Sequence, residues 1–271
     1  MFEAYALPVI IIALAGFVCA VILAIAAKYM SVPEVEGFEE IRAELPGANC
    51  GGCGFAGCDD YAKKLASDHT TPTTLCPVGG PECARKISAI LGVEAGEMIE
   101  RAAVVACSGS SECTSYIMDY EGIPTCEACN IFYQGRRACS HACLGFGDCV
   151  DACQFGALHI CNGVAVVDRD LCTACGKCVA KCPNHLIKLE PKAATVFVAC
   201  SSHDKGAHTR KVCSAGCIGC KKCEKACPVQ AVTVTDNLAE IDQSKCTGCG
   251  ACAEACPVHI IHQLQPATVC T

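Results

Sequence analysis

The sequence contains no tryptophan, only 8 phenylalanines and 6 tyrosines, and charged residues make up 18% of its 271 positions. So few large side chains exclude a large hydrophobic core. The net charge is −7, so the chain lacks the positive surface that nucleic-acid phosphates require. Neither the glycine-rich dinucleotide fingerprint nor a P-loop occurs. The composition therefore argues against nucleic-acid binding and against an independent substrate pocket, and we assign no catalytic residue.

Cysteine, in contrast, occupies 30 positions. Such a share is typical of small secreted scaffolds held by disulfides, but those scaffolds are much shorter than this chain. Composition alone leaves disulfides and metal as alternatives, so the spacing of the cysteines has to decide between them. The length predicts two or three domains.

An uncharged apolar run covers residues 4–27. As a helix it would be about 36 Å long, enough to cross a bilayer core. A signal peptide or a buried helix is the alternative, but a signal peptide would begin with basic residues, and here the first cation, Lys28, follows the run. Because Lys28 and Arg42 follow the run, we expect a retained membrane anchor with the C-terminal domains in the cytoplasm.

A repeat with an offset of 74 residues runs through the second half of the chain. Eight cysteines recur at this offset without a gap, which indicates an internal duplication. Asp168 matches Asp242 and His185 matches His259, so the repeated unit is a whole module in which the histidines have a structural role. The cysteines of the first copy are Cys139, Cys143, Cys149, Cys153, Cys172, Cys175, Cys178 and Cys182. Those of the second are Cys213, Cys217, Cys223, Cys227, Cys246, Cys249, Cys252 and Cys256.

Three stretches, at 172–183, 217–228 and 246–257, follow the C-x2-C-x2-C-x3-C-P spacing of bacterial ferredoxins. In that spacing three thiolates hold one four-iron cluster, and the fourth, before proline, ligates the other cluster. Zinc sites usually show two separated C-x2-C pairs, and cysteines three apart on one loop cannot all form disulfides without strain. The second copy is therefore predicted to bind two clusters, through Cys217, Cys220, Cys223 and Cys256 and through Cys246, Cys249, Cys252 and Cys227.

The first copy departs from this pattern at Phe146 and Gln154, where the second has cysteine and proline. Cys139 is a thiol on the same loop and is the expected replacement ligand, with a three-iron cluster as the alternative. Its repeat partner Cys213 is then redundant and is expected to be a free thiol. The predicted ligand sets are Cys139, Cys143, Cys149 and Cys182 for one cluster and Cys172, Cys175, Cys178 and Cys153 for the other.

A separate set of four cysteines lies earlier in the chain, among glycines that let the backbone turn and aim N–H groups at sulfur. Its members follow the spacing C-x2-C-x4-C-x17-C and are Cys50, Cys53, Cys58 and Cys76. The flanking segments 34–45, 59–67 and 80–91 are predicted to be helical. The company of the ferredoxin stretches favours a four-iron cluster here, and zinc is the alternative.

These sets predict five [4Fe-4S] clusters held by twenty cysteines. Cys126 and Cys129 form a lone C-x2-C, which could build a sixth site with Cys107 and Cys113; the alternative is buried thiols without a ligand role. The cysteines without an assigned role are Cys19, Cys83, Cys107, Cys113, Cys126, Cys129, Cys161, Cys200, Cys213 and Cys270.

Basic residues gather near the second ferredoxin copy, although the chain as a whole is acidic and each oxidised cluster would add about two negative charges. They form a candidate docking patch for an acidic electron carrier, and an ordinary solvated surface is the alternative. This basic patch consists of Lys205, Arg210, Lys211, Lys221, Lys222 and Lys225.

The order of these features resembles the B-subunit family of Rnf complexes, the ion-translocating ferredoxin:NAD oxidoreductases of bacterial membranes. The resemblance covers nearly the whole chain and is most specific in LPGANCGGCGFAGC, with further support from CLGFGDCVDAC, VDRDLCTACGKCV, CSAGCIGCKKC and NLAEID. It implies an electron-transfer subunit of a translocase in the bacterial inner membrane. That subunit would contact lipid, accept electrons from soluble reduced ferredoxin and pass them to flavoprotein and integral-membrane subunits, coupled to export of sodium ions or protons.

Two ferredoxin pairs favour this family over the related Rsx-type reductases, which have a single pair. An iron-sulfur subunit of a hydrogenase or dehydrogenase is a further alternative, and a zinc-binding module is a third. The cluster nearest Phe146 and Gln154 is the one that departs from the family pattern.

The predicted fold is a single transmembrane helix followed by small α+β iron-sulfur modules. These modules are an α-helical four-iron domain and two bacterial-type ferredoxin-like domains with two clusters each. The predicted boundaries are 1–30 for the anchor, 33–95 for the four-cysteine domain, 96–135 for a linker, and 136–192 and 210–266 for the two di-cluster domains.

Overall fold

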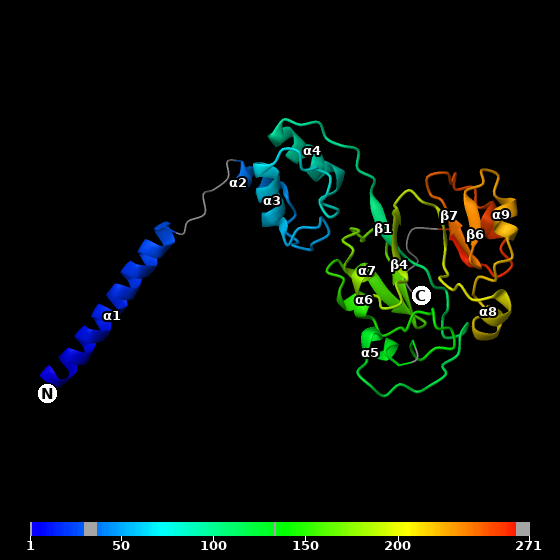
Figure 1. The fold of residues 1–271 in the computed structure, drawn as a ribbon, viewed down its shortest axis with the longest axis horizontal. Coiled ribbons are helices and arrows are strands. Elements are labelled where there is room, and N and C mark those ends of the chain that lie inside the picture. The colour runs from blue at the N-terminus through cyan, green and yellow to red at the C-terminus, as the bar shows by residue number, and fades with distance from the viewer. Residues whose placement is uncertain (1, 30–36, 133, 264–271) are drawn as a thin grey trace.

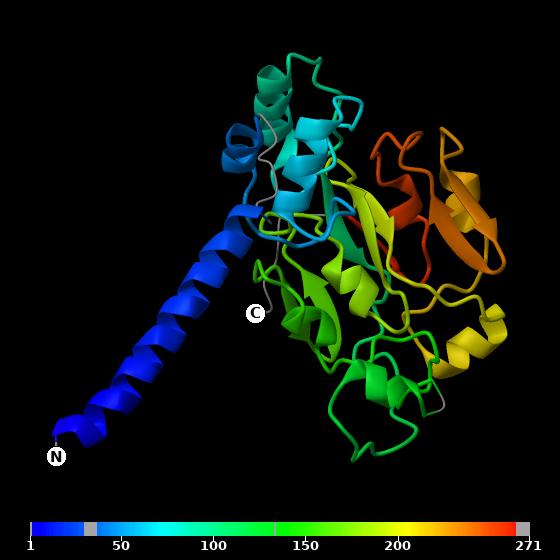
Figure 2. The same cartoon turned by 60° about the vertical axis from the view of Figure 1, so that its left-hand side comes forward.

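The computed structural model describes residues 2–29, 37–132 and 134–263. Helix α1 (Phe2–Tyr29) stands apart from the other elements in both ribbon views (Figures 1 and 2). Cys270 and the last residues of the predicted 210–266 domain lie outside the described residues.

The membrane anchor expected at residues 1–30 requires a correction. Within the described residues, no helix has the length and apolar character needed to span a bilayer. The side chains of α1 are described over residues 13–26, and a helix of that length rises about 21 Å, less than the ~30 Å hydrocarbon core. The single-pass placement in the inner membrane is therefore not supported.

The first folded unit is helical and contains α2 (Phe38–Glu44), α3 (Cys58–Ser67) and α4 (Gly80–Leu91). The helices predicted at 59–67 and 80–91 are confirmed, while the one predicted at 34–45 begins in residues that are not described. Apolar side chains at helical spacing form the core of this helical unit, since Tyr61 and Ile87 are at most 1% exposed.

The second folded unit, here the first ferredoxin-like unit, contains two antiparallel strand pairs, β1 with β4 and β2 with β3. Its elements are β1 (Arg101–Val105), α5 (Cys126–Asn130), α6 (Asp148–Asp151), β2 (Leu158–Cys161), β3 (Val164–Val167), α7 (Lys177–Lys181) and β4 (Ile187–Pro191). The segment 96–135, predicted as a linker, thus contributes a strand and a short helix. Because β1 pairs with the last strand, this unit begins before the repeat does.

The third folded unit, the second ferredoxin-like unit, repeats this topology with β5 paired to β8 and β6 to β7. Its elements are β5 (Val196–Val198), α8 (Gly206–Val212), α9 (Lys222–Ala226), β6 (Val232–Thr235), β7 (Leu238–Ile241), α10 (Ala251–Glu254) and β8 (Ile261–Gln263). The starts of β2, β3 and β4 recur 74 residues later as those of β6, β7 and β8, so the duplication extends to the fold.

The opening strands β1 and β5 match in structure but not in sequence offset. The N–H of Ala106 donates to the carbonyl of Leu186, and the N–H of Ala199 donates to the carbonyl of Ile260, both at 2.7 Å. Leu186 and Ile260 are 74 residues apart, whereas Ala106 and Ala199 are 93 apart. The first strand of each unit therefore lies outside the constant spacing of the repeat.

The matching histidines make the same turn in both units. His185 and His259 have positive φ angles of 51° and 49°, and their N–H groups donate to the carbonyls of Cys182 and Cys256. Histidine adopts this left-handed conformation more readily than most residues. The backbone turn accounts for the repeated structural role that the sequence predicted.

The two ferredoxin-like units lie side by side in both ribbon views (Figures 1 and 2). The N–H of Ser214 donates to the carbonyl of Cys113 (2.9 Å), and Ser108 Oγ lies 2.7 Å from His262 Nε2. Cys139 and Cys213 share a small buried cluster at this junction. Thiols and other small residues therefore fill the interface between the units.

Candidate metal centres

The cysteines of the helical unit gather in its core. Cys76 forms a hydrogen bond with the thiol of Cys83, which lowers the pKa of Cys76 to about 6 and raises the pKa of Cys83. The N–H of Gly79 donates to Cys76 Sγ (3.3 Å), and the N–H of Gly52 donates to Cys50 Sγ (3.5 Å). The thiols that pack in this core are Cys53, Cys58, Cys76 and Cys83. The structure thus brings three predicted ligands together and adds Cys83, which the sequence left unassigned.

In the first ferredoxin-like unit, one set of four thiols lies where the sequence predicted it. Burial raises the pKa of Cys178 to about 11, and the charges of nearby thiols raise it further. Those neighbours are Cys172, Cys175 and Cys153. The N–H of Ala103, in β1, donates to Cys172 Sγ (3.3 Å), and the N–H of Ala157 donates to Cys153 Sγ (3.4 Å). Four predicted ligands are therefore neighbours.

The other set in this unit differs from the prediction. One pocket is lined by Cys126, Cys143, Cys149 and Cys182. Burial raises the pKa of Cys149 to about 12, and the charges of Cys143, Cys126 and Cys182 add to that rise. The structure thus places Cys126, and not the expected Cys139, with these three thiols.

Local contacts explain why Cys126 reaches this pocket. It opens α5, where its N–H donates to Asp148 Oδ1 (2.8 Å) beside Cys149. Phe146, which occupies the repeat position of Cys220, packs against a buried cluster that contains Cys126. A thiol from a distant segment therefore takes the place that the loop leaves open.

The second ferredoxin-like unit brings both predicted sets together. Burial raises the pKa of Cys223 to about 11, and the charges of Cys217, Cys220 and Cys256 raise it further. Burial also raises the pKa of Cys252, next to Cys246 and Cys227. The remaining member of that set, Cys249, is exposed on the same loop.

These thiol sets fit four-iron clusters in their chemistry. Such a cluster needs four thiolates, an apolar surrounding and backbone N–H donors to sulfur. The pocket of Cys126 has apolar walls, including Val105, Leu144 and Ile187, and the N–H of Leu186 donates to Cys182 Sγ (3.4 Å). Within the described part of the chain, no group of three or more His, Cys, Asp or Glu side chains is arranged to hold a single metal ion.

Comparison with known proteins supports an iron-sulfur assignment. Residues 216–260 match the 4Fe-4S dicluster domain, residues 165–188 match the 4Fe-4S binding domain, and residues 45–78 match a family described as a putative Fe-S cluster. Ferredoxin-type 4Fe-4S domains are therefore present in this chain.

Curated relatives match over most of the chain. The B subunit of the ion-translocating oxidoreductase complex of Methanosarcina acetivorans is 45% identical over 231 residues, which cover 85% of this chain and 87% of the relative. The chain belongs to the B-subunit family of ion-translocating oxidoreductase complexes. Family members in Acetobacterium woodii and Clostridium ljungdahlii are 40% and 38% identical, covering 90% and 87% of this chain and 74% and 83% of their own lengths. The resemblance stated from the sequence is thus confirmed.

In this member of the B-subunit family, the helical unit touches the first ferredoxin-like unit at Gly52. A methyl group at this position would lie 2.9 Å from the carbonyl oxygen of Cys175 and 2.9 Å from Pro77 Cγ. Only a residue without a side chain allows the loop of Cys50 and Cys53 to approach the loop of Cys175 this closely. Two candidate cluster loops of different units are therefore in contact.

Replacing Gly52 with alanine is expected to loosen this contact, because the added methyl group meets the backbone of Cys175 and overpacking costs ~1–3 kcal/mol. Thermal unfolding of the metal-loaded protein should shift to lower temperature. Gly96→Ala is the matched control, since a methyl group there would lie at an ordinary 3.4 Å from Thr74. Equal unfolding temperatures for the two variants would contradict the role assigned to Gly52.

Proposed function

We propose that this chain is the electron-transfer subunit of an ion-translocating ferredoxin:NAD+ oxidoreductase complex and that it accepts electrons from reduced ferredoxin. The relative from Acetobacterium woodii is named as the B subunit of a Na(+)-translocating ferredoxin:NAD(+) oxidoreductase complex, and that from Clostridium ljungdahlii as the B subunit of a proton-translocating one. The observation that carries the proposal is the succession of thiol pockets through three adjoining units. Flavoprotein and integral-membrane subunits of the same complex would be its partners.

Five four-iron clusters are proposed in these pockets. When bound, each cluster supplies a one-electron redox couple. The proposed ligand sets keep those predicted from the sequence, except that Cys126 replaces Cys139. They are Cys50, Cys53, Cys58 and Cys76; Cys172, Cys175, Cys178 and Cys153; Cys126, Cys143, Cys149 and Cys182; Cys217, Cys220, Cys223 and Cys256; and Cys246, Cys249, Cys252 and Cys227. Buried apolar walls and N–H donors to sulfur would set the potentials.

The proposed domain limits follow the strand pairing. The helical domain spans about the predicted 33–95. Each ferredoxin-like domain is proposed to begin at its opening strand, β1 or β5, and not at positions 136 or 210, because that strand pairs with the last strand of the same unit.

Neighbouring pockets lie close enough to suggest a continuous route. In the first ferredoxin-like unit, the charge of Cys178 in one pocket contributes to the raised pKa of Cys149 in the next. In the second unit, Cys223 and Cys252 of different sets share one buried core. Together with the Gly52 contact, these neighbours support a relay along the chain.

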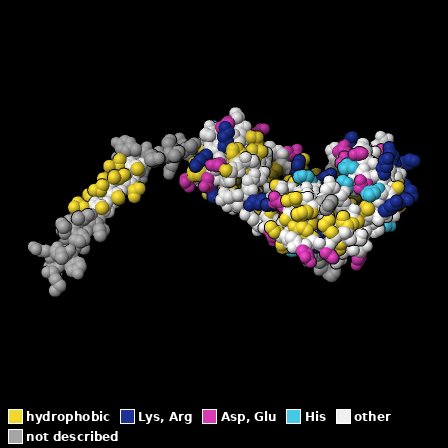
Figure 3. Space-filling model, turned by 60° about the horizontal axis from the view of Figure 1, so that its bottom comes forward, with side chains coloured by type: hydrophobic (Ala, Val, Ile, Leu, Met, Phe, Trp, Pro, Cys, Tyr) yellow, Lys and Arg dark blue, Asp and Glu magenta, His cyan; other side chains and the backbone are white. Residues whose placement is uncertain are grey.

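The basic patch is proposed as the docking site for reduced ferredoxin. All six of its side chains are exposed, and three of them lie on or beside α9 next to Cys220 and Cys223. Figure 3 shows Lys and Arg side chains gathered at the end of the molecule that lies farthest from α1. An acidic carrier would be attracted to this end despite the net negative charge of the chain.

Replacing Lys221 and Lys222 with glutamate is expected to lower the rate of reduction by ferredoxin by about tenfold at low salt, because steering by the patch reverses sign. Stopped-flow absorbance at several salt concentrations would measure this rate, and the difference should shrink as salt screens the charges. The control is Lys63→Glu with Arg85→Glu, two exposed cations of the helical unit. The same loss of rate in both double variants would place docking elsewhere.

The function as a whole is tested on the anaerobically purified complex. We expect bound iron and acid-labile sulfide in the chain, bleaching of the cluster absorbance by reduction with ferredoxin, and co-purification of a flavoprotein. A chain loaded mostly with zinc would contradict the redox role. Co-purification with a hydrogenase, and without flavoprotein and membrane subunits, would favour the alternative of another redox complex.

A further inference from the structure

A pocket at the junction of the two ferredoxin-like units is lined by four thiols that belong to none of the five proposed sets. They are Cys107, Cys139, Cys200 and Cys213. Cys107 follows β1, Cys200 follows β5, and Cys213 ends α8, so each unit contributes two of them. The pocket walls between them are formed largely by small side chains, among them Ala142 and Ala199.

The four thiols are related by the internal duplication. Cys139 and Cys213 are repeat partners, 74 residues apart. Cys107 and Cys200 each follow the alanine that pairs with the last strand, so they occupy equivalent places although their sequence offset differs. The fold therefore places two equivalent pairs of thiols around one point between the units.

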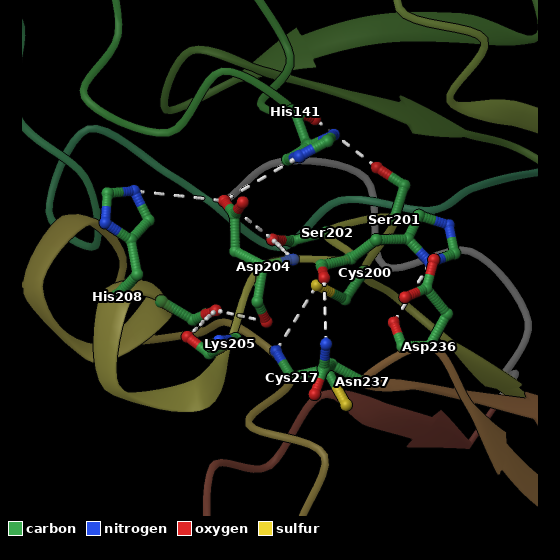
Figure 4. A network of polar contacts seen from close by, with 12 residues as sticks. His141, Cys200, Ser201, Ser202, Asp204, Lys205, His208, Cys217, Asp236 and Asn237 are labelled. Carbon is green, nitrogen blue, oxygen red and sulfur yellow. Dashed lines mark hydrogen bonds and ion pairs between the residues drawn. The ribbon is translucent and has the colours of Figure 1, made fainter.

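Backbone groups support these sulfurs in the same way as those of the five sets. Cys107 Sγ accepts from the N–H groups of Gly109 and Cys143, both at 3.4 Å. Cys200 Sγ accepts from the N–H of Cys217 (3.3 Å), a contact visible in Figure 4. Cys143 and Cys217 are themselves proposed ligands, so the pocket lies one hydrogen bond away from a proposed cluster on either side.

All four sulfurs lie within electrostatic range of one another. Burial raises the pKa of Cys139 to about 12, and the charges of Cys213, Cys107 and Cys200 raise it further. Burial likewise raises the pKa of Cys107, with contributions from Cys200 and Cys213, and the pKa of Cys213, with a contribution from Cys200. Thiolates grouped in this way are stable only with a bound cationic centre.

A buried cation adjoins the pocket. Arg137 is 2% exposed and donates to the carbonyls of Gly109 (2.6 Å) and Gly163 (2.8 Å). Among the described residues it forms no ion pair with a carboxylate, and its charge acts on Cys213. Buried charges are nearly always compensated, and an anionic centre held by the four thiolates would compensate this one.

We propose that Cys107, Cys139, Cys200 and Cys213 bind a sixth four-iron cluster, shared by the two ferredoxin-like units. Four cysteine thiolates in a buried pocket are the ligand set of such a cluster. Its position makes it the link between the units, a role that rests on the proposed relay, whereas the metal site itself does not. The sixth site that the sequence suggested is thereby redrawn: it keeps Cys107, while Cys126 lines the neighbouring pocket.

Iron and sulfide analysis of the anaerobically purified full chain tests this site. With six clusters we expect about 24 irons per chain, and about 20 in the double variant Cys107→Ala/Cys200→Ala. Cys139→Ala/Cys213→Ala should lose the same four, and the quadruple variant should lose no more than either pair. Cys113→Ala is the matched control, because this neighbouring thiol does not line the pocket, and it should keep all the irons.

About 20 irons in the wild-type protein and no loss in the double variants would overturn the sixth site. So would one zinc ion per chain that disappears in those variants. Either result would leave the proposed function intact if ferredoxin still reduces the remaining clusters. About 24 irons in a protein that ferredoxin does not reduce would instead contradict the proposed function and support the site.

Discussion

Cys126→Ala is expected to disrupt one four-iron cluster, with loss of between one and about four irons per chain, depending on whether a three-iron form persists. The reason is that Cys126 lines the pocket of Cys143, Cys149 and Cys182, and removing a fourth thiolate leaves this pocket incomplete. Ferredoxin oxidation by the complex should fall at least about tenfold, because the relay loses one of its centres. Iron analysis and EPR spectra of the reduced protein would measure the change.

Two further variants make this prediction specific. Cys129→Ala removes a fully buried thiol three residues away that does not line the pocket, and it should keep all the irons. Combining Cys126→Ala with Cys139→Ala should give additive losses, because the two cysteines belong to different pockets. Full iron content in Cys126→Ala, together with loss in Cys139→Ala, would restore the ligand set predicted from the sequence.

Arg137→Leu is expected to destabilise the junction between the ferredoxin-like units by about 3 kcal/mol or more. It removes two charge-assisted hydrogen bonds, to the carbonyls of Gly109 and Gly163, inside a buried site. For a unit of this size, thermal unfolding of the loaded protein should shift down by roughly 10 °C. The iron held by the four junction thiols should be lost at the same time, because their counter-charge is gone.

Arg137→Lys separates the two effects, since lysine keeps the charge but cannot donate in the same forked geometry. We expect this variant to retain the junction iron while unfolding at an intermediate temperature. If Arg137→Leu matched the wild-type protein in both iron content and unfolding temperature, the guanidinium would have neither role.

Much of the local site chemistry could be predicted without coordinates. The C-x2-C-x2-C-x3-C-P stretches place thiols such as Cys172 and Cys178 on a single loop, and this short-range geometry is fixed by the chain itself. The crossed ligand, such as Cys153 or Cys256, also follows from the spacing, because the repeat constrains both halves of a unit. The helices 59–67 and 80–91 were predictable in the same way, from apolar residues that recur at helical spacing.

The opening strands were not predictable from these signals. β1 is five residues long and lies before the repeat, in a segment whose sequence predicts a linker. It becomes part of the unit only by pairing with β4, more than 80 residues later. That pairing is also what carries Cys107 to the junction, so missing the strand meant missing the ligand.

The sequence by itself determined the family, the ferredoxin-type modules and the thiol loops, because each depends on residues that are close in the chain or repeated at a constant offset. Only the tertiary structure decided which distant thiols complete the pockets. Cys126 takes the place left by Phe146, and Cys139 faces Cys213 across the junction instead of Cys143. No spacing rule relates such residues, since packing of separate segments and of the two units against each other brings their sulfurs together.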